Sequence, residues 1–229
     1  MQEDSGISFE SQMEPMEWAK FMVRTRSEKN YGTAFSILSA SANKGSPDAE
    51  FYLGLLYSRG QGVRGDLHAA RYWFERASTG GNLSAMYFLG KMYSKGYGAD
   101  KDACKAISFL AVPAETGDPR AQYELGLIYF DGSGGTKDLP SAVRWFTVSA
   151  ESGHSEAQFV LGQLYKTGYG VERDTERALN WLTSAAMNRH RGAQILLGNM
   201  YDTGDGVPAD RDEADRWYSM SEKKVISAL

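Results

Sequence analysis

The sequence predicts an all-α chain built from tandem helix pairs, and three observations support this fold class. The dipeptide Leu-Gly recurs at a constant interval of 36 residues, which places its glycines at Gly54, Gly90, Gly126, Gly162 and Gly198. Apolar residues flank each dipeptide at helical spacing. Glycine also recurs where the helices should end, with 25 glycines but only 6 prolines in 229 residues. A period of this length is typical of a solenoid.

The register divides the chain into one continuous solenoid domain, with each repeat counted from an alanine. Five repeats cover 49–84, 85–120, 121–156, 157–192 and 193–229, the last including the C-terminal end. Upstream, Ala34, Ile37 and Gly45 keep the repeat register. We therefore expect a degenerate capping helix pair over 14–48, preceded by a tail over 1–13, since an end repeat has only one neighbour.

The first helix of each repeat, helix A, is predicted over positions 1–11. Positions 1, 5, 8 and 9 are apolar or aromatic, and position 9 is tyrosine in all five repeats. The glycine at position 6 lies inside this helix, where glycine costs about 1 kcal/mol relative to alanine. Its recurrence indicates that the partner helix approaches the backbone closely.

The second helix, helix B, should follow a glycine turn at positions 12–15. An aspartate at position 18 is the expected N-cap, because its carboxylate can accept hydrogen bonds from backbone N–H groups. Alanine at position 22 and an aromatic residue at position 25 are expected to face helix A. Pro113 interrupts this pattern in the second repeat and should kink or shorten its helix B.

This pattern resembles a known repeat family, and the fourth repeat carries the motif most fully. The matching residues are Ala157, Leu161, Gly162, Tyr165, Gly168, Gly170, Val171, Asp174, Ala178, Trp181 and Ala185. They are similar to the Sel-1-like repeat, a relative of the tetratricopeptide repeat. The resemblance implies a right-handed superhelical α/α solenoid with helix A on the concave side. It also implies a non-enzymatic scaffold or adaptor, often found in bacterial systems.

The constant positions form the scaffold, so the variable positions 3, 7 and 10 of helix A are the candidates for binding. They lie opposite the constant face and should point into the concave groove. The predicted partner-binding residues are Phe51, Leu55, Tyr87, Lys91, Tyr123, Leu127, Phe130, Phe159, Gln163, Lys166, Asn199 and Asp202. Aromatic side chains are frequent interface anchors. An alternative interpretation stays open for position 3, whose apolar side chains also suit burial between successive A helices.

Few residues suggest catalysis or metal binding. His68 and Cys104 share position 20 in adjacent repeats, where a nucleophilic pair is conceivable, but the exposed start of helix B is the favoured interpretation. His154 and His190 share position 34 in the turn between repeats, and two histidines alone make a weak metal site. We assign no catalytic residue, cofactor or metal.

The net charge of −4 argues against a nucleic-acid partner, which requires a concentrated basic surface. The sequence contains no apolar stretch of roughly 18 residues, so it predicts no transmembrane segment. We expect a monomer that binds a protein or peptide. The resemblance implies two hypotheses for its role, an immunity-type toxin neutraliser and an envelope or host-interaction protein. The alternative is a small-molecule-binding or hydrolytic protein that uses the same groove.

The compartment is not fixed by the sequence. A single cysteine excludes an internal disulfide. The polar, acidic N-terminus lacks the features of a signal peptide, which favours the cytoplasm. A periplasmic or secreted location stays open if Met1 replaces a removed leader.

Overall fold

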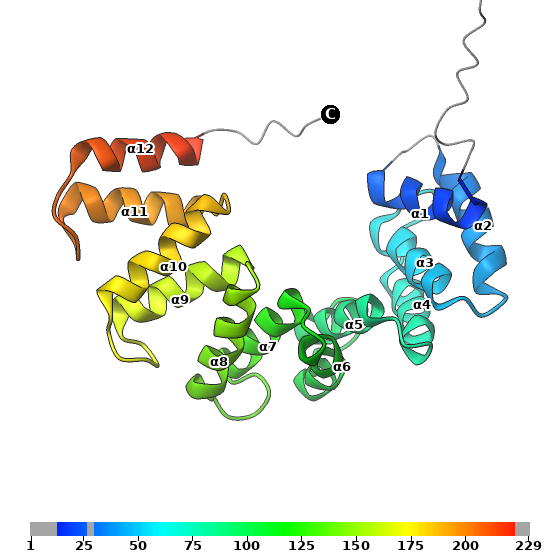
Figure 1. The fold of residues 1–229 in the computed structure, drawn as a ribbon. Helices are drawn as coiled ribbons and strands as arrows, with labels where there is room; N and C mark the ends of the chain where they lie inside the picture. The colour runs from blue at the N-terminus through cyan, green and yellow to red at the C-terminus, as the bar shows by residue number, and fades with distance from the viewer. Residues whose placement is uncertain (1–12, 27–29, 223–229) are drawn as a thin grey trace, which may run out of the picture. The chain divides into compact units, whose positions relative to one another are not determined.

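The computed structural model describes residues 13–26 and 30–222, and within these ranges the secondary structure is entirely helical (Figure 1). This confirms the all-α fold class. The predicted tail over 1–13 and the chain after Glu222 lie almost wholly outside the described residues. The helices are α1 (Pro15–Thr25), α2 (Tyr31–Ala42), α3 (Pro47–Arg59), α4 (Leu67–Thr79), α5 (Leu83–Lys95), α6 (Ala103–Glu115), α7 (Pro119–Asp131), α8 (Leu139–Glu151), α9 (Ser155–Thr167), α10 (Thr175–Met187), α11 (Arg191–Thr203) and α12 (Arg211–Glu222).

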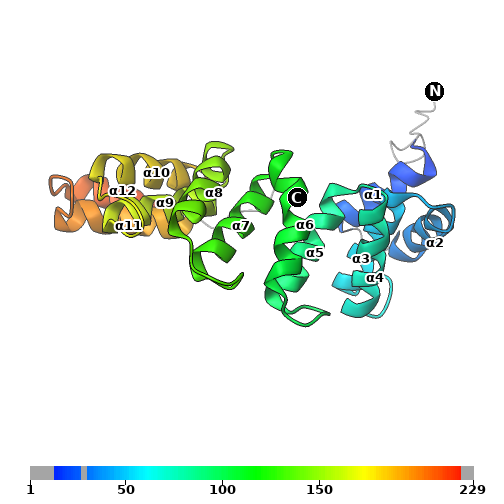
Figure 2. The ribbon, with the colours of Figure 1, turned by 90° about the horizontal axis from the view of Figure 1, so that it is seen from below.

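The chain divides into two compact units, Met1–Val112 and Pro113–Leu229, which are described separately. In the first unit, α1 packs on α2, α2 on α3, α3 on α4 and α4 on α5. In the second unit, each helix from α7 to α11 packs on the next one along the chain. Figures 1 and 2 show these neighbours as stacked pairs, such as α3 beside α4 and α9 beside α10.

The helix pairs follow the predicted repeat, with one difference at the start of helix A. The A helices α3, α5, α7, α9 and α11 each begin two residues earlier than predicted, so that α3 starts at Pro47 rather than Ala49. The reason is an N-cap immediately upstream: Ser46, for example, accepts a hydrogen bond from the backbone N–H of Ala49. Upstream, α1 and α2 form the helix pair expected for the capping repeat.

Pro113 does not shorten its helix, so the expectation of a shorter helix was wrong, while the alternative, a kink, stays a prediction. Helix α6 contains 13 residues, as α4 and α8 do, with Pro113 inside it. Proline removes one backbone hydrogen bond. Because Pro113 lies in the last turn, that loss does not prevent the helix from reaching Glu115. The boundary between the two units falls at this proline.

The glycine at position 6 allows helices A and B to pack closely, as the sequence predicted. A methyl group placed on Gly54 would lie 2.5 Å from Cε1 of Phe74, and one on Gly162 would lie 2.6 Å from Cγ of Leu182. Both Phe74 and Leu182 are buried and occupy position 26. Position 26 was not singled out in the sequence, although it is large and apolar or aromatic in every repeat.

A fixed turn joins the two helices of a pair. In the fourth repeat, Gly168 ends α9 with a φ of 75°, in the left-handed region that favours glycine. Asp174 then caps α10, because its carboxylate accepts from the backbone N–H of Arg177 at 2.9 Å. The backbone N–H of Asp174 donates to the carbonyl of Tyr165 at 2.9 Å. The predicted aspartate caps are therefore confirmed, and this backbone bond closes the turn.

Buried glutamines at position 2 connect successive repeats in the second unit. Gln158 donates from Nε2 to the carbonyl of Ala150 at 3.0 Å and accepts from Asn188 at 2.9 Å. Gln194 bonds the carbonyl of Ala186 in the same way, at 2.9 Å. These side chains give each new helix A a polar contact with the end of the preceding helix B.

In the first repeat an ion pair replaces the glutamine. Glu50 occupies position 2 of the first repeat, is buried, and accepts from Nη2 of Arg76 at 2.7 Å. Arg76 also donates to the carbonyl of Ala42, the position that glutamine reaches in other repeats.

Replacing Gly54 with alanine should destabilise the first unit, because the new methyl group would collide with Phe74. Overpacking of this kind costs about 1–3 kcal/mol. Urea denaturation monitored by circular dichroism would measure the loss. Gly32→Ala is the matched control, since Gly32 lies in α2 and a methyl group there meets nothing within 4 Å. We expect the control to leave stability unchanged or to raise it by at most about 1 kcal/mol. Equal losses in both variants would contradict the role of close approach.

Gln158→Ala should lower the free energy of unfolding by about 1–2 kcal/mol, because two side-chain hydrogen bonds at a buried site are lost. Gln163, one and a half turns further along α9, is exposed and provides the control. Gln163→Ala should change stability by less than about 0.5 kcal/mol. Thermal unfolding of both variants would test the contrast, and indistinguishable midpoints would refute it.

Candidate functional site

The predicted binding residues of the first unit contribute mainly to packing. Leu55 is 5% exposed and Tyr87 is 8% exposed, so neither offers much surface to a partner. Phe51 is half-buried, and its ring centroid lies 5.8 Å from that of Phe88. Lys91 is half-buried and places its ammonium group 6.0 Å from the centroid of the Tyr87 ring. In this unit the helical wheel did not predict how deeply these side chains are buried.

In the second unit, the predicted residues of α7 are partly accessible and rest on the core. Tyr123, Leu127 and Phe130 are half-buried and pack against a cluster that contains Phe146. The Tyr123 and Phe146 ring centroids are 5.8 Å apart, and those of Phe130 and Phe146 are 6.1 Å apart. Each of these side chains therefore has one face in the core.

The next repeat covers part of Phe130. The ring of Tyr169 meets it edge to face with a centroid distance of 5.7 Å. Lys137 places its ammonium group 5.1 Å from the Phe130 centroid and donates a hydrogen bond to the Tyr169 hydroxyl. A cationic group over aromatic rings is attracted by their negative faces. This arrangement connects position 10 of one repeat to position 13 of the next.

The predicted residues on α9 and α11 form a more polar surface. Gln163 and Asn199 are exposed at position 7, and Asn199 accepts a hydrogen bond from the Tyr218 hydroxyl at 2.8 Å. At position 10, Lys166 pairs with Asp205 at 2.6 Å. Asp202 at the same position pairs with Arg211, also at 2.6 Å.

The side chains at position 3 of α7 and α9 lie between successive repeats. Tyr123 stacks on His154 with ring centroids 4.9 Å apart, and Phe159 stacks on His190 with centroids 4.3 Å apart. Burial raises the pKa of the Tyr123 hydroxyl above its usual value. These aromatic residues therefore help to join repeats, whatever else they contact.

His154 and His190 are N-caps, a role that sequence analysis missed. His154 accepts at Nδ1 from the backbone N–H of Ala157 at 3.3 Å, and His190 accepts from Ala193 at 3.0 Å. The equivalent residues of three other repeats, Ser46, Asn82 and Asp118, are typical N-cap types that could have revealed this position. Burial lowers the pKa of the His154 imidazole below its usual value.

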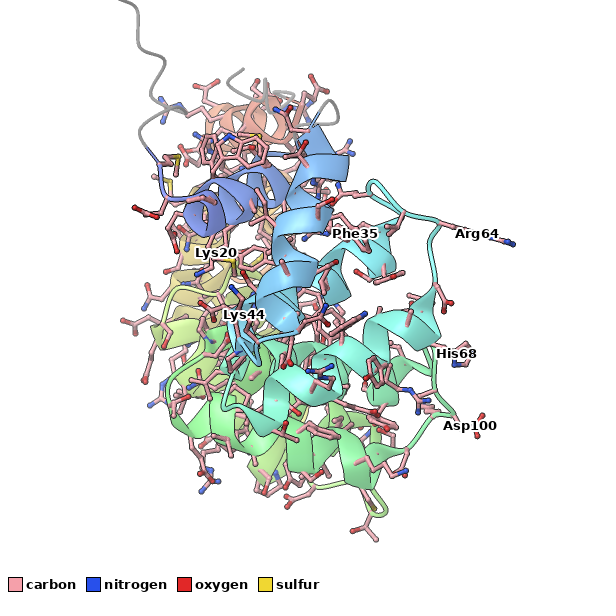
Figure 3. All side chains as sticks on the ribbon, turned by 90° about the vertical axis from the view of Figure 1, so that its right-hand side faces the viewer. Lys20, Phe35, Lys44, Arg64, His68 and Asp100 are labelled. Atoms are coloured by element: carbon pink, nitrogen blue, oxygen red, sulfur yellow. The ribbon has the colours of Figure 1, made fainter. Side chains whose placement is uncertain are left out.

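The candidates for chemistry lie on the surface. His68 and Cys104 are exposed near the starts of α4 and α6, and Figure 3 shows His68 directed away from the first unit. Among residues 13–26 and 30–222, no group of three or more His, Cys, Asp or Glu side chains is arranged to hold a metal ion. Within the same part of the chain, no helix has the length and apolar character needed to span a bilayer.

Comparison with known proteins identifies the repeat. The Sel1 repeat matches five segments, residues 47–82, 83–111, 119–154, 155–190 and 192–224. A Sel1 repeat protein from Oxalobacter formigenes is 30% identical, with a TM-score of 0.78 over 89% of this chain and 81% of that one. A protective antigen of uropathogenic Escherichia coli with an SLR fold is 31% identical, with a TM-score of 0.82. The match covers 90% of this chain and 44% of the antigen.

A more distant likeness concerns the fold alone. An immunity protein from Pseudomonas aeruginosa is 20% identical, with a TM-score of 0.59 over 92% of this chain and 83% of that one. No curated protein matches the sequence. The five matched segments cover most of the chain, and each overlaps one helix pair of the structure. The chain therefore belongs to the Sel1 repeat family, whose repeats generally act as protein-interaction modules.

Proposed function

We propose that this protein is a non-enzymatic adaptor and that α7, α9 and α11 of its second unit present the surface that binds a protein or peptide. The observation that carries the proposal is the division between constant and variable positions. The constant alanines and leucines of these helices are buried, as at Ala157 and Leu161, which are 0% exposed. The variable residues Gln163 and Asn199 on α9 and α11 remain exposed.

The chemistry of this surface changes from one helix to the next. Helix α7 offers the half-buried apolar groups of Tyr123, Leu127 and Phe130. Exposed amides follow on α9 and α11, and position 10 of the same two helices carries the ion-paired residues Lys166 and Asp202. A segment that binds here would place apolar side chains against α7 and hydrogen-bonding groups against α9 and α11. Phe159 of α9 is half-buried and stacks on His190.

The class of the partner is a finer part of the proposal. The family resemblance suggests an immunity-type role, with a toxin as partner, or a role in envelope or host interaction. The likeness to the Pseudomonas aeruginosa immunity protein supports the fold that such a role would use. A hydrolytic or small-molecule-binding protein is the alternative. Turnover of a substrate, lost when His68 or Cys104 is replaced, would favour the hydrolase.

Charge placed on the proposed surface should weaken binding of the physiological partner. We would capture the partner from the native host with the tagged full-length chain, identify it by mass spectrometry and purify it. Calorimetry would then compare the wild type with the double variant Gln163→Arg and Asn199→Arg. Two arginines on the surface should exclude a closely fitting segment and raise the Kd at least about tenfold. This change corresponds to a loss of about 1.4 kcal/mol in the free energy of binding.

The control places the same charge elsewhere in the same unit. Asn180 is exposed on α10, the B helix that pairs with α9. Asn180→Arg should leave the Kd within about twofold, and circular dichroism should show that all variants are folded. If Asn180→Arg weakens binding as much as the double variant does, the A-helix surface is not the binding site.

A further inference from the structure

His154 occupies a junction between two repeats of the second unit. It lies directly before α9, and its Nδ1 atom accepts the backbone N–H of Ala157. Its ring is half-buried and stacks on Tyr123 of α7, with an angle of 30° between the ring planes. One side chain therefore caps one helix and covers an aromatic residue of another.

This geometry requires the neutral form of the imidazole. A backbone N–H can only donate, so Nδ1 must carry its lone pair and the proton of the neutral ring must be on Nε2. Protonation of Nδ1 would bring two donors face to face. It would also place a positive charge at the N-terminus of α9, where the helix dipole is itself positive. A protonated His154 thus loses the interaction that holds it in place.

We propose that His154 is a proton-sensitive cap that couples mild acidity to the opening of the junction between α7 and α9. Protonation releases the ring from the N-terminus of α9, frees the backbone N–H of Ala157, and uncovers the face of Tyr123 on which the imidazole stacks.

The surroundings of His154 determine the pH range of this change. Burial is the largest effect and lowers the pKa of the imidazole. The nearby carboxylates of Glu156, Asp118 and Glu124 raise this pKa. The guanidinium of Arg120 lowers it further. The net direction is downward. An unfolded histidine titrates near pH 6.5. The unfolded chain therefore binds a proton more readily than the folded one, and stability falls as the pH drops below about 6.5.

The chain contains two natural comparisons for this cap. Asn82 occupies the same position before α5, where its Oδ1 accepts from the backbone N–H of Ala85 at 2.9 Å without any titratable group. His190 occupies it before α11, but its Nε2 lies 3.1 Å from Oε2 of Glu156. That carboxylate holds the ring of His190 at Nε2, whereas no such contact holds Nε2 of His154 among the described residues. The ring of His154 is therefore held by its bond to Ala157 and its stack on Tyr123.

The last step of this inference rests on the proposed function, since uncovering Tyr123 regulates binding only if α7 contributes to the binding surface. The cap itself can be tested on the free protein. If the cap shows no response to pH, the proposal about His154 is refuted. If the arginine variants described above do not weaken partner binding, the proposed binding surface is refuted.

The test compares the wild type with His154→Asn, which keeps a capping side chain but removes the titration. Amide hydrogen exchange by NMR, corrected for the intrinsic rate, would follow Ala157 from about pH 7.5 to about pH 5. In the wild type, the protection of the Ala157 amide against exchange should fall about fivefold over this range. Loss of a typical N-cap shifts a local opening equilibrium by about this factor. Ring resonances of Tyr123 should shift over the same range. In His154→Asn, both changes should be absent.

His190→Asn is the matched variant, and it should retain the pH response of Ala157. The histidine resonances would give the titration of His154 directly, with a midpoint expected below that of an unfolded histidine. The proposal is overturned if His154→Asn shows the wild-type response, or if His190→Asn abolishes it. It is also overturned if His154 titrates with no change in the protection of Ala157.

Discussion

The close contact between the two helices of each pair is the constraint on which the rest of the structure depends. At Gly54 and Gly162 the neighbouring side chains, Phe74 and Leu182, occupy the space that a Cβ atom would need. This contact brings the backbones together and fixes how helix B lies on helix A. The turn that closes at Asp174 then has a constant span. In the second unit, the histidine caps and the glutamine bonds then join one such helix pair to the next.

Much of this fold could be predicted from one sequence because the chain repeats itself. The period, the glycine turn and the aspartate caps each depend on local chemistry and recur in five repeats. The earlier start of helix A was missed because its cap is a histidine in two repeats, at His154 and His190. The contact at position 26 was missed because periodicity identifies an apolar side chain without identifying the atoms it meets. The effect of Pro113 depended on its place in the last turn.

The candidate site was less predictable, since the surface of a helix depends on what its neighbours cover. Leu55 and Gln163 share position 7, yet Leu55 is buried and Gln163 is exposed. Their difference follows from the packing around each repeat rather than from their place on a helical wheel. Tyr123 and Phe159 likewise stack on the caps of the next repeat, which a helical wheel does not predict. In the second unit, variability and exposure coincide on α9 and α11, and this is why the proposed site lies there.

The backbone bond from Asp174 to Tyr165 has a consequence for how such a chain can change in length. The same bond occurs from Asp66 to Tyr57 and from Asp210 to Tyr201, so these turns close over an identical span. An added or deleted residue within the span would break the closure and displace the aspartate that starts the next helix. Duplication of an entire helix pair avoids this damage, because both ends of the new unit match their neighbours. Evolution can therefore lengthen the array in whole modules, while diversity accumulates as substitutions on the A helices.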